Sequence, residues 1–272
     1  MCSSDLQYFE VVGVAKDTGV LKEVSEREGI RVVDAPLERP ISLVKDIKGL
    51  WFLYRLFRKE KPWCVHANTP KGSLLAMIAA WFACVPHRVY TVTGLRYQGA
   101  HGMLRTILKT MERLSCLFAT NVIPEGQGVL HALQEDFITK KPLRVIWNGN
   151  INGIDTEFFL PVENTNDKSD TFTFVFIGRM VKDKGIHELT ECMRQLNCRL
   201  ILVGTFEEED AVSESDKEFL TTSDKVKFVG WQSDVRPFLA QADALVFPSY
   251  REGFPNVPMQ AGAMGLPSIV TN

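Results

Sequence analysis

Residues 244–272 read ALVFPSYREGFPNVPMQAGAMGLPSIVTN, and this stretch decides the fold of the chain. Its apolar start, Ala244–Phe247, predicts a buried strand, and a polar loop follows. A helix then starts near Pro255, because proline is tolerated in a first helical turn, where its missing N–H would have no intrahelical partner. Ser268–Thr271 predicts the next strand. Strand, helix and strand in this order form the βαβ unit of a parallel sheet.

The same alternation runs through the whole chain. Apolar runs rich in β-branched and aromatic residues are separated by helix-like stretches, which predicts an α/β fold whose parallel sheets are covered on both faces. The predicted strands are Phe9–Ala15, Arg31–Asp34, Trp63–Ala67, Arg88–Thr93, Thr120–Ile123, Leu143–Trp147, Phe172–Gly178, Arg199–Gly204, Lys225–Gly230, Ala244–Pro248 and Ser268–Thr271. The predicted helices lie near 17–28, 41–60, 70–85, 101–117, 125–135, 184–197, 209–221, 233–241 and 256–264.

A polar segment divides the chain. Residues 161–171 read PVENTNDKSDT and show no hydrophobic periodicity, which predicts a linker. A length of 272 residues also favours two domains, since a domain typically has about 100–200 residues. We therefore expect an N-terminal domain over residues 1–160 and a C-terminal domain over 172–272. Each end of the chain lacks part of a βα unit, which predicts a piece of a longer protein.

The composition is that of a globular protein. Hydrophobic residues make up 45% and charged residues 24%, which excludes a disordered, a collagen-like or a disulfide-stapled chain. The net charge is −2, but it is unevenly spread: residues 1–150 hold 20 basic and 14 acidic side chains, and residues 151–272 hold 11 and 19. A basic half suits an anionic surface or substrate, and it equally suits an ordinary solvated surface.

The cysteines and the apolar runs predict a cytoplasmic location. The six cysteines are scattered without a C-x-x-C pair, which is typical of a reducing compartment. Met1–Leu6 has neither the basic start nor the apolar core of a signal peptide. The longest apolar run, Leu74–Val85, has 12 residues, whereas a membrane span needs about 20.

A cationic loop follows the predicted strand Phe172–Gly178. It carries Arg179 and Lys184 just before Gly185 opens a helix. Ligands of open parallel sheets bind at the carboxyl ends of strands, and a helix start offers free N–H groups to anions. An arginine fork and a mobile lysine charge together suit a diphosphate, although solvated loop cations give the same pattern. The chain has neither a G-x-x-x-x-G-K-[ST] nor a G-x-G-x-x-G loop.

Glu252 lies just ahead of the last predicted helix. Its carboxylate can accept hydrogen bonds from hydroxyl groups, and Gln260 follows about 7.5 Å further along the helix axis. This spacing suits the two ends of a nucleotide sugar. A carboxylate that merely complements the helix N-terminus would have the same position.

An ordered set of motifs extends over both predicted domains. In the second domain the motifs are Gly178-Arg179…Lys184-Gly185, Gly230-Trp231, Pro248-Ser249…Glu252-Gly253-Phe254-Pro255 and Gly265-Leu266-Pro267. Together they resemble the family-4 retaining nucleotide-sugar glycosyltransferases. Val65-His66-Ala67, Tyr90–Arg96 and Val145–Asp155 resemble landmarks of that family's first domain. The resemblance implies the GT-B architecture: two Rossmann-like domains with parallel sheets, and an active site in the cleft between them.

The resemblance also implies roles for individual residues. Arg179 and Lys184 would bind the donor diphosphate and neutralise the leaving nucleotide, and Glu252 would hold hydroxyls of the transferred sugar. Retention would rest on electrostatic stabilisation of the transition state. Because the chain has no D-x-D motif, no metal ion and no cofactor are expected. The further donor-binding residues would be Gly178, Gly230, Trp231 beside the base, Ser249, Gly253, Phe254, Pro255, Asn256 and Gln260 at the ribose.

The expected acceptor-side residues are His66, Thr93, Gly94 and Arg96. Two positions depart from the family pattern. Gln260 stands where the family has a second glutamate, and its amide can still bind a ribose hydroxyl. Thr93 stands where the family commonly has histidine, and a hydroxyl can orient a sugar but cannot carry a positive charge. His66 also fits a purely structural histidine.

One further pattern predicts contact with a membrane. Arg105, Lys109 and Arg113 recur every four residues, and the Leu50–Lys61 segment is amphipathic. We expect this face to bind anionic lipid at the inner side of the cytoplasmic membrane, although a solvated helix shows the same periodicity.

The sequence thus predicts a glycosyltransferase that moves a sugar from a nucleoside-diphosphate donor, with uridine as the expected base, to a glycan or lipid-linked acceptor. The family implies a role in capsule, lipopolysaccharide or exopolysaccharide synthesis, and no nucleic-acid partner is expected. Two alternatives stay open: a nucleotide-sugar epimerase of the same architecture, and an inactive or binding-only fragment. The sugar, the acceptor and the linkage are not determined by the sequence.

Overall fold

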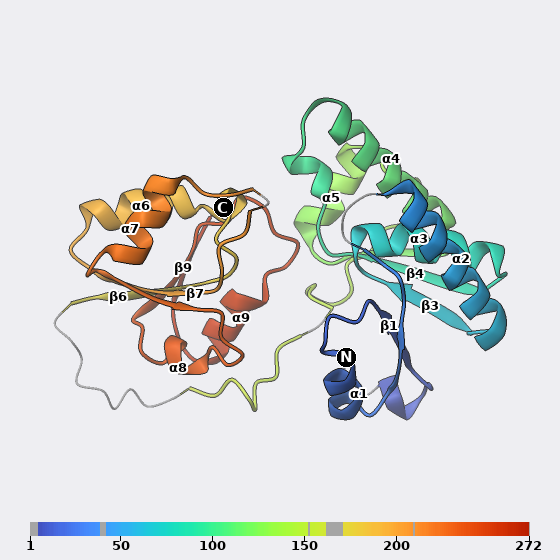
Figure 1. Cartoon of the computed structure of the whole chain (residues 1–272), viewed down its shortest axis with the longest axis horizontal. Coiled ribbons are helices and arrows are strands. Elements are labelled where there is room, and N and C mark those ends of the chain that lie inside the picture. Colours follow the sequence, from blue (N-terminus) through green and yellow to red (C-terminus); the bar gives the residue numbers. More distant parts are fainter. Residues whose placement is uncertain (1–4, 39–41, 152, 162–170, 209, 272) are drawn as a thin grey trace. The chain divides into compact units, whose positions relative to one another are not determined.

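The computed structural model describes residues 5–38, 42–151, 153–161, 171–208 and 210–271. The chain divides into two units, Met1–Asn152 and Gly153–Asn272, each built from parallel strands and helices (Figure 1). The predicted α/β fold is therefore confirmed. Most of the predicted linker lies outside the described residues.

The second unit contains one five-stranded parallel sheet, in the order β10-β9-β6-β7-β8. Its strands are β6 (Thr173–Ile177), β7 (Arg199–Val203), β8 (Val226–Gly230), β9 (Ala244–Phe247) and β10 (Ser268–Val270). Its α-helices are α6 (Ile186–Gln195), α7 (Glu214–Thr222), α8 (Arg236–Leu239) and α9 (Asn256–Ala263). The chain adds β7 and β8 on one side of β6 and then returns to add β9 and β10 on the other. The order therefore reverses between β6 and β9, which is the switch point of a doubly wound sheet.

Each face of this sheet has its own core. Val175 and Ile177 of β6 pack with α8 and α9, whereas Phe176 between them packs with α6 and α7. Figure 1 shows the two helix pairs on opposite faces of the sheet. Successive side chains of a strand point to opposite faces, so a strand that is apolar throughout must be covered twice.

The first unit contains two parallel sheets, β1-β2 and β3-β4-β5. The strands are β1 (Val12–Ala15), β2 (Arg31–Asp34), β3 (Cys64–Ala67), β4 (His87–Val92) and β5 (Asn121–Pro124). The α-helices are α1 (Leu21–Glu28), α2 (Leu43–Glu60), α3 (Pro70–Phe82), α4 (Gly102–Phe118) and α5 (Gln127–Glu135). One core joins α2 and α3 to the larger sheet, with Met77, Tyr90 and Leu133 fully buried in it.

One predicted strand, Leu143–Trp147, is wrong. Only Leu143 forms a bridge, to Val122 of β5, and Trp147 has a positive φ of 52° that turns the chain out of the extended conformation. The segment is held instead by Lys141, whose ammonium donates to carbonyls at the end of α4. The other predicted strands are confirmed within a few residues at their ends.

The predicted helices are also found, but several are shorter than expected. The helix predicted over 209–221 begins at Glu214, because the Ser213 side chain accepts a hydrogen bond from the Asp216 N–H and caps the helix there. Of the helix predicted over 233–241, only Arg236–Leu239 is helical, and it forms α8. Among the described helices, none is long and apolar enough to cross a membrane.

Candidate functional site

Three glycines lie side by side where β6, β7 and β8 end. The Gly178 N–H donates to Val203 O (3.0 Å), and the Gly204 N–H donates to Gly230 O (2.8 Å). Gly204 has a φ of +134°, and a Cβ there would lie 1.9 Å from the carbonyl oxygen of Gly178. None of the three positions carries a side chain, and at Gly204 there is no room for one. Gly178 and Gly230 were expected at this edge, whereas Gly204 was missed, although it too directly follows an apolar strand.

The loop after β6 contacts the loop after β9 through the backbone and through an ion pair. Gly185 has a φ of +68°, and a Cβ there would lie 2.1 Å from the carbonyl oxygen of Pro248. Asp183 accepts at its backbone oxygen from the Tyr250 N–H (2.9 Å), and its carboxylate forms an ion pair with Arg251. Asp183 thus joins two loops that are far apart in sequence, and no local pattern marks it.

This contact brings together Lys184 and Glu252. The Lys184 ammonium donates to the Glu252 carboxylate in an ion pair that is largely shielded from solvent. The ammonium also lies 5.6 Å from the ring centroid of Phe247, in cation–π distance. Both residues follow the strands that flank the switch point, where open α/β sheets bind ligands. The sequence predicted each residue separately, and the fold places them in contact.

Arg179 has a different partner. Its guanidinium is 58% exposed and donates to the carboxylate of Glu207 beyond β7, at 2.9 Å. Each of the two predicted cations is therefore paired with its own carboxylate. An exposed pair of this kind contributes roughly 0–1 kcal/mol, so an anionic ligand can displace Glu207 at low cost.

The remaining predicted donor residues surround the start of α9 and the end of β8. Pro255 precedes α9 in an extended conformation, and the helix begins at Asn256, where the predicted range 256–264 begins. Gly253, Phe254 and Gln260 are half-buried. The residue before the helix, Pro255, forms no side-chain cap.

Ser249 and Trp231 differ in what they offer a ligand. Ser249 is buried, and its hydroxyl donates to the Asp183 carbonyl at 3.4 Å, so it ties the two loops together. Trp231 is 71% exposed beside Gly230. A flat, exposed indole can stack on a planar base.

The predicted acceptor-side residues lie at the carboxyl ends of β3 and β4 in the first unit. The His66 ring lies 2.8 Å from the hydroxyl of Thr91 on the neighbouring strand. The Thr93 hydroxyl donates to Asn68 O (2.9 Å), so it already has an acceptor within the unit. Gly94 is half-buried, and Arg96 is exposed.

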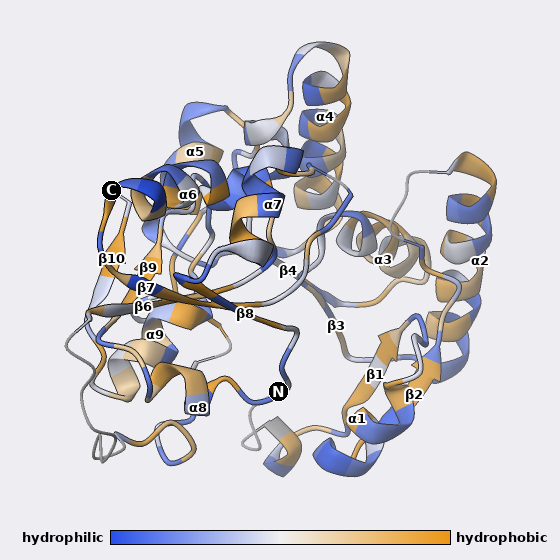
Figure 2. Ribbon diagram, turned by 60° about the vertical axis from the view of Figure 1, so that its left-hand side comes forward, coloured by the Kyte–Doolittle hydropathy of each residue, from blue (hydrophilic) through white to orange (hydrophobic). Residues whose placement is uncertain are grey.

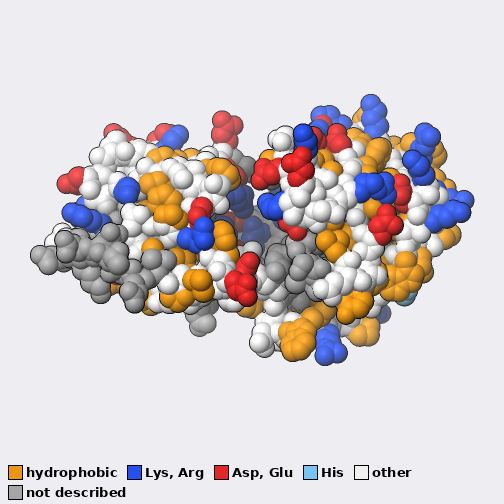
Figure 3. All heavy atoms as spheres, turned by 90° about the horizontal axis from the view of Figure 1, so that it is seen from below, with side chains coloured by type: hydrophobic (Ala, Val, Ile, Leu, Met, Phe, Trp, Pro, Cys, Tyr) orange, Lys and Arg blue, Asp and Glu red, His pale blue; other side chains and the backbone are white. Residues whose placement is uncertain are grey.

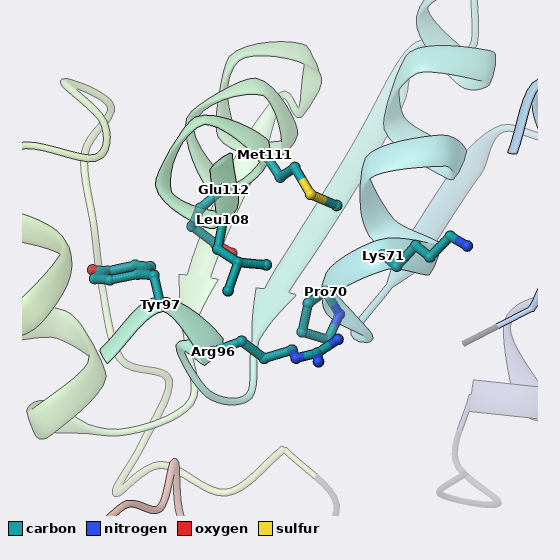
Figure 4. A pocket seen from close by; sticks show the side chains of 7 residues that line it. All are labelled: Pro70, Lys71, Arg96, Tyr97, Leu108, Met111 and Glu112. Carbon is teal, nitrogen blue, oxygen red and sulfur yellow. The ribbon is translucent and has the colours of Figure 1, made fainter. Parts of the chain in front are cut away.

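Arg96 borders a pocket in the first unit. Figure 4 shows its side chain extending beneath Pro70, with Glu112 at the back of the pocket. The lining residues are Pro70, Lys71, Arg96, Tyr97, Leu108, Met111 and Glu112. Burial raises the pKa of Glu112 to about 7, although the hydroxyl of Tyr90 donates to it at 2.6 Å. Sequence reasoning missed Glu112, because a single glutamate in an amphipathic helix is ordinary.

The basic face of α4 is bound within the unit. The Lys109 ammonium lies 2.5 Å from the Asp136 carboxylate, and Arg105 lies 3.9 Å from it. Arg113 donates to the Asp136 carbonyl. Burial works to raise the pKa of Asp136, but the hydrogen bond from Lys109 and the nearby positive charges outweigh it, and the pKa is lowered. Asp136 thus offers one negative charge to three cations, and lipid binding by this face stays a prediction.

One group of side chains has the composition of a metal site. His187, Glu191 and Asp216 offer ligand atoms within 4.8 Å of one another. The Arg194 guanidinium, however, lies 3.4 Å from Glu191 and 3.7 Å from Asp216. Because the Arg194 cation already lies beside both carboxylates, we interpret the group as an ionic link between α6 and α7.

Family models match both parts of the chain. Residues 7–158 match the model described as Glycosyltransferase Family 4, and residues 171–272 match Glycosyl transferases group 1. The capsular polysaccharide biosynthesis glycosyltransferase CapM of Staphylococcus aureus is 36% identical over 87% of this chain and 66% of its own length. The UDP-Gal:alpha-D-GlcNAc-diphosphoundecaprenol alpha-1,3-galactosyltransferase of Escherichia coli is 28% identical over 98% of this chain and 72% of its own. The chain thus spans only about two thirds of the length of these relatives.

Solved structures confirm the expected GT-B fold. HepE of Anabaena in complex with UDP-glucose matches 95% of this chain and 72% of its own, with a TM-score of 0.75 and 21% identity. A sucrose-phosphate synthase from Thermosynechococcus elongatus matches 98% of this chain and 72% of its own, with a TM-score of 0.77 and 20% identity. At these identities the likeness extends to the fold alone.

Proposed function

Because this chain belongs to glycosyltransferase family 4, we propose that it binds a uridine-diphosphate sugar in its second unit. We further propose that the whole protein transfers the sugar, with retention, to a lipid-linked glycan in the assembly of a surface polysaccharide. The names of the relatives support this choice, since one acts in capsule synthesis and another uses UDP-galactose and a diphosphoundecaprenol-linked acceptor.

The observation that carries the proposal is the contact of Lys184 and Glu252 at the switch point of the second sheet. Lys184 binds the diphosphate and stabilises its negative charge as the sugar leaves. Arg179 adds a second cation once the ligand replaces Glu207. Glu252 exchanges its ionic partner for hydroxyls of the sugar. A preorganised charge at the leaving group is the largest contribution that such a site can make.

The glycine edge and α9 complete the donor site in this proposal. Gly178 and Gly230 let the nucleotide approach the backbone, since a side chain at either position would narrow the edge. Trp231 stacks on the base, and Gln260 binds the ribose. The N–H groups at the start of α9 face negative charge. With two cations for one diphosphate, the site needs no metal ion to bind its donor.

The acceptor is proposed to bind the first unit. His66, Thr93, Gly94 and Arg96 lie at the ends of two adjacent strands or directly after them. A lipid-linked acceptor requires the protein to work at a membrane surface, and we place it at the inner face of the cytoplasmic membrane.

Calorimetric titration with UDP, GDP and ADP tests the donor site. We expect UDP to bind, and the Arg179→Ala/Lys184→Ala variant to bind at least about tenfold more weakly, because each charge-assisted hydrogen bond contributes roughly 1.5–3 kcal/mol. Arg199→Ala/Lys227→Ala is the matched control, since it removes two exposed cations from other positions of the same sheet.

The proposal fails if the folded chain binds none of the three nucleotides, or if both double variants bind UDP equally well. A chain that binds UDP but neither hydrolyses nor transfers a UDP-linked sugar would be a binding-only fragment. Release of an epimerised UDP sugar would favour an epimerase.

A further inference from the structure

Helix α2 exposes a row of large apolar side chains. Leu43 is 80% exposed, Val44 67%, Ile47 65% and Trp51 60%. Residues 43, 47 and 51 recur every four positions and so share one face of the helix. We call these four residues the α2 stripe. Figure 2 shows hydrophobic and hydrophilic positions alternating along this helix.

The opposite face of α2 packs into the core of the first unit. Gly49, Leu53 and Phe57 are buried and also recur every four positions. Leu53 and Phe57 belong to the core of the first unit. The α2 stripe is therefore a second apolar face, which the folding of the described residues does not need. Exposed apolar surface of this kind marks a site of interaction.

Cations border the α2 stripe. Lys48, Arg55, Arg58 and Lys59 are exposed, and within the described parts of the chain none of them forms an ion pair. The two acidic residues of the helix are engaged elsewhere: Asp46 with Lys71 and Glu60 with Arg31. The rim of the stripe thus carries a net positive charge. Figure 3 shows basic and hydrophobic side chains interspersed on the first unit.

We propose that the α2 stripe binds the first unit to the surface of an anionic lipid bilayer, with the axis of α2 parallel to that surface. This inference rests on the proposed function, because a lipid-linked acceptor brings the protein to a membrane. Apolar side chains would enter the boundary between headgroups and acyl chains, and the bordering cations would contact anionic headgroups.

Two observations favour lipid over a second copy of the chain. An interface between two copies of the stripe would bring the unpaired cations of both copies to one contact, where like charges repel, whereas an anionic bilayer complements them. Trp51 of the stripe also forms a ring pair with Tyr54, with the ring centroids 5.5 Å apart. Amphipathic aromatic rings prefer the level of the lipid headgroups.

This surface differs from the one that the sequence predicts. The expected segment, Leu50–Lys61, contains the buried Leu53 and Phe57. The expected basic face of α4 is engaged by Asp136. Within α2, the exposed apolar surface lies instead in the N-terminal half of the helix.

Flotation of the full chain with vesicles tests the proposal. We use vesicles of phosphatidylcholine alone, and vesicles of phosphatidylcholine and phosphatidylglycerol in equal parts. We expect binding to the anionic vesicles, and weaker binding in high salt. Ile47→Ser/Trp51→Ser and Lys48→Glu/Arg55→Glu should each lower the bound fraction by about tenfold or more. Leu117→Ser/Phe137→Ser is the matched control, because it removes two exposed apolar side chains elsewhere on the same unit and should bind as the unchanged chain does.

Three results would overturn the proposal. The unchanged chain could fail to float with anionic vesicles, or both α2 variants could float as it does. Sedimentation could instead show that the α2 variants turn a dimer into a monomer, which would make the stripe an interface between copies. UDP titration of the same preparations separates the two proposals: UDP binding without flotation contradicts only the lipid surface, and flotation without UDP binding contradicts only the donor site.

Discussion

The pKa values of buried carboxyl groups are shifted in opposite directions in the two units. In the first unit, burial raises the pKa of Glu112 to about 7 and that of Glu125 to about 6. In the second unit, burial also works to raise the pKa of Asp216, but hydrogen bonds from Ser213 and His187 outweigh it, and the pKa is lowered. Burial thus favours the neutral form of an acid in one unit, whereas hydrogen bonds favour the charged form in the other.

The two units therefore differ in their exposed surfaces and in the charge of their buried groups, although both are built from βα units. The first unit encloses carboxyl groups among apolar side chains and exposes an apolar stripe on α2. The second unit places its charges in ion pairs at the switch point of a five-stranded sheet. If burial and pairing cause these differences, single substitutions in each unit should change its stability or activity in the direction that its own contacts dictate.

The largest effect should come from Gly204→Ala in the second unit. The new Cβ would clash with the Gly178 carbonyl at a φ that alanine avoids, and a backbone carbonyl cannot move aside as the end of a flexible side chain can. We expect a loss of more than about 4 kcal/mol in the free energy of unfolding of this unit, measured by urea denaturation. Gly262→Ala in α9 is the control, because a Cβ there meets nothing within 4 Å. If both variants are equally stable, the glycine edge is not tightly packed.

Glu252→Gln should lower sugar transfer by about 100-fold or more, because an amide holds the sugar hydroxyls without a charge. Nucleotide affinity should not fall, since the change also releases Lys184 from its ionic partner. Initial rates with a UDP sugar and calorimetry with UDP separate these two effects. Glu218→Gln on α7 should leave both unchanged. A parallel loss of affinity and rate in Glu252→Gln would contradict the assigned role.

The first unit should lose stability as the pH rises. Glu112 binds its proton more tightly in the folded state, so its contribution is present below the ordinary pKa of 4.5 and is lost as the pH rises through about 7. The loss amounts to about 3 kcal/mol between about pH 4.5 and pH 7. Four of the five tryptophans lie in this unit, so urea denaturation followed by tryptophan fluorescence reports on it.

Glu112→Gln should remove most of this pH dependence, because an amide does not titrate. The smaller slope that remains belongs to Glu125. A variant that keeps the full slope would show that Glu112 is charged in the folded state.

The smallest effect should come from His187→Ala in the second unit. The hydrogen bond and charge of Asp216 raise the pKa of His187, so the stabilisation is present below the ordinary pKa of 6.5 and is lost as the pH rises through the folded-state value. Thermal unfolding should therefore separate the variant from the unchanged chain at about pH 5.5 and much less at about pH 8.5. His131→Ala on α5 should show no such difference, and an equal difference at both pH values would count against the ion pair.

The sequence by itself determined the local features of this protein. Apolar runs predicted the strands, because a strand covered on both faces must be apolar at successive positions. The motifs around Arg179 and Glu252 identified the family and marked the donor loops. The strand predicted at Leu143–Trp147 failed because the backbone turns at Trp147, which a pattern of apolar residues does not record.

Only the tertiary structure decided which groups meet and which remain in water. Lys184 and Glu252 are 68 residues apart and come together because β6 and β9 are neighbours. The pKa of Glu112 and the exposure of the α2 stripe depend on what covers each side chain. Two amphipathic helices with similar sequence patterns can differ in which side chains are buried. The reason is that burial and ion pairing depend on elements that lie far away in the sequence.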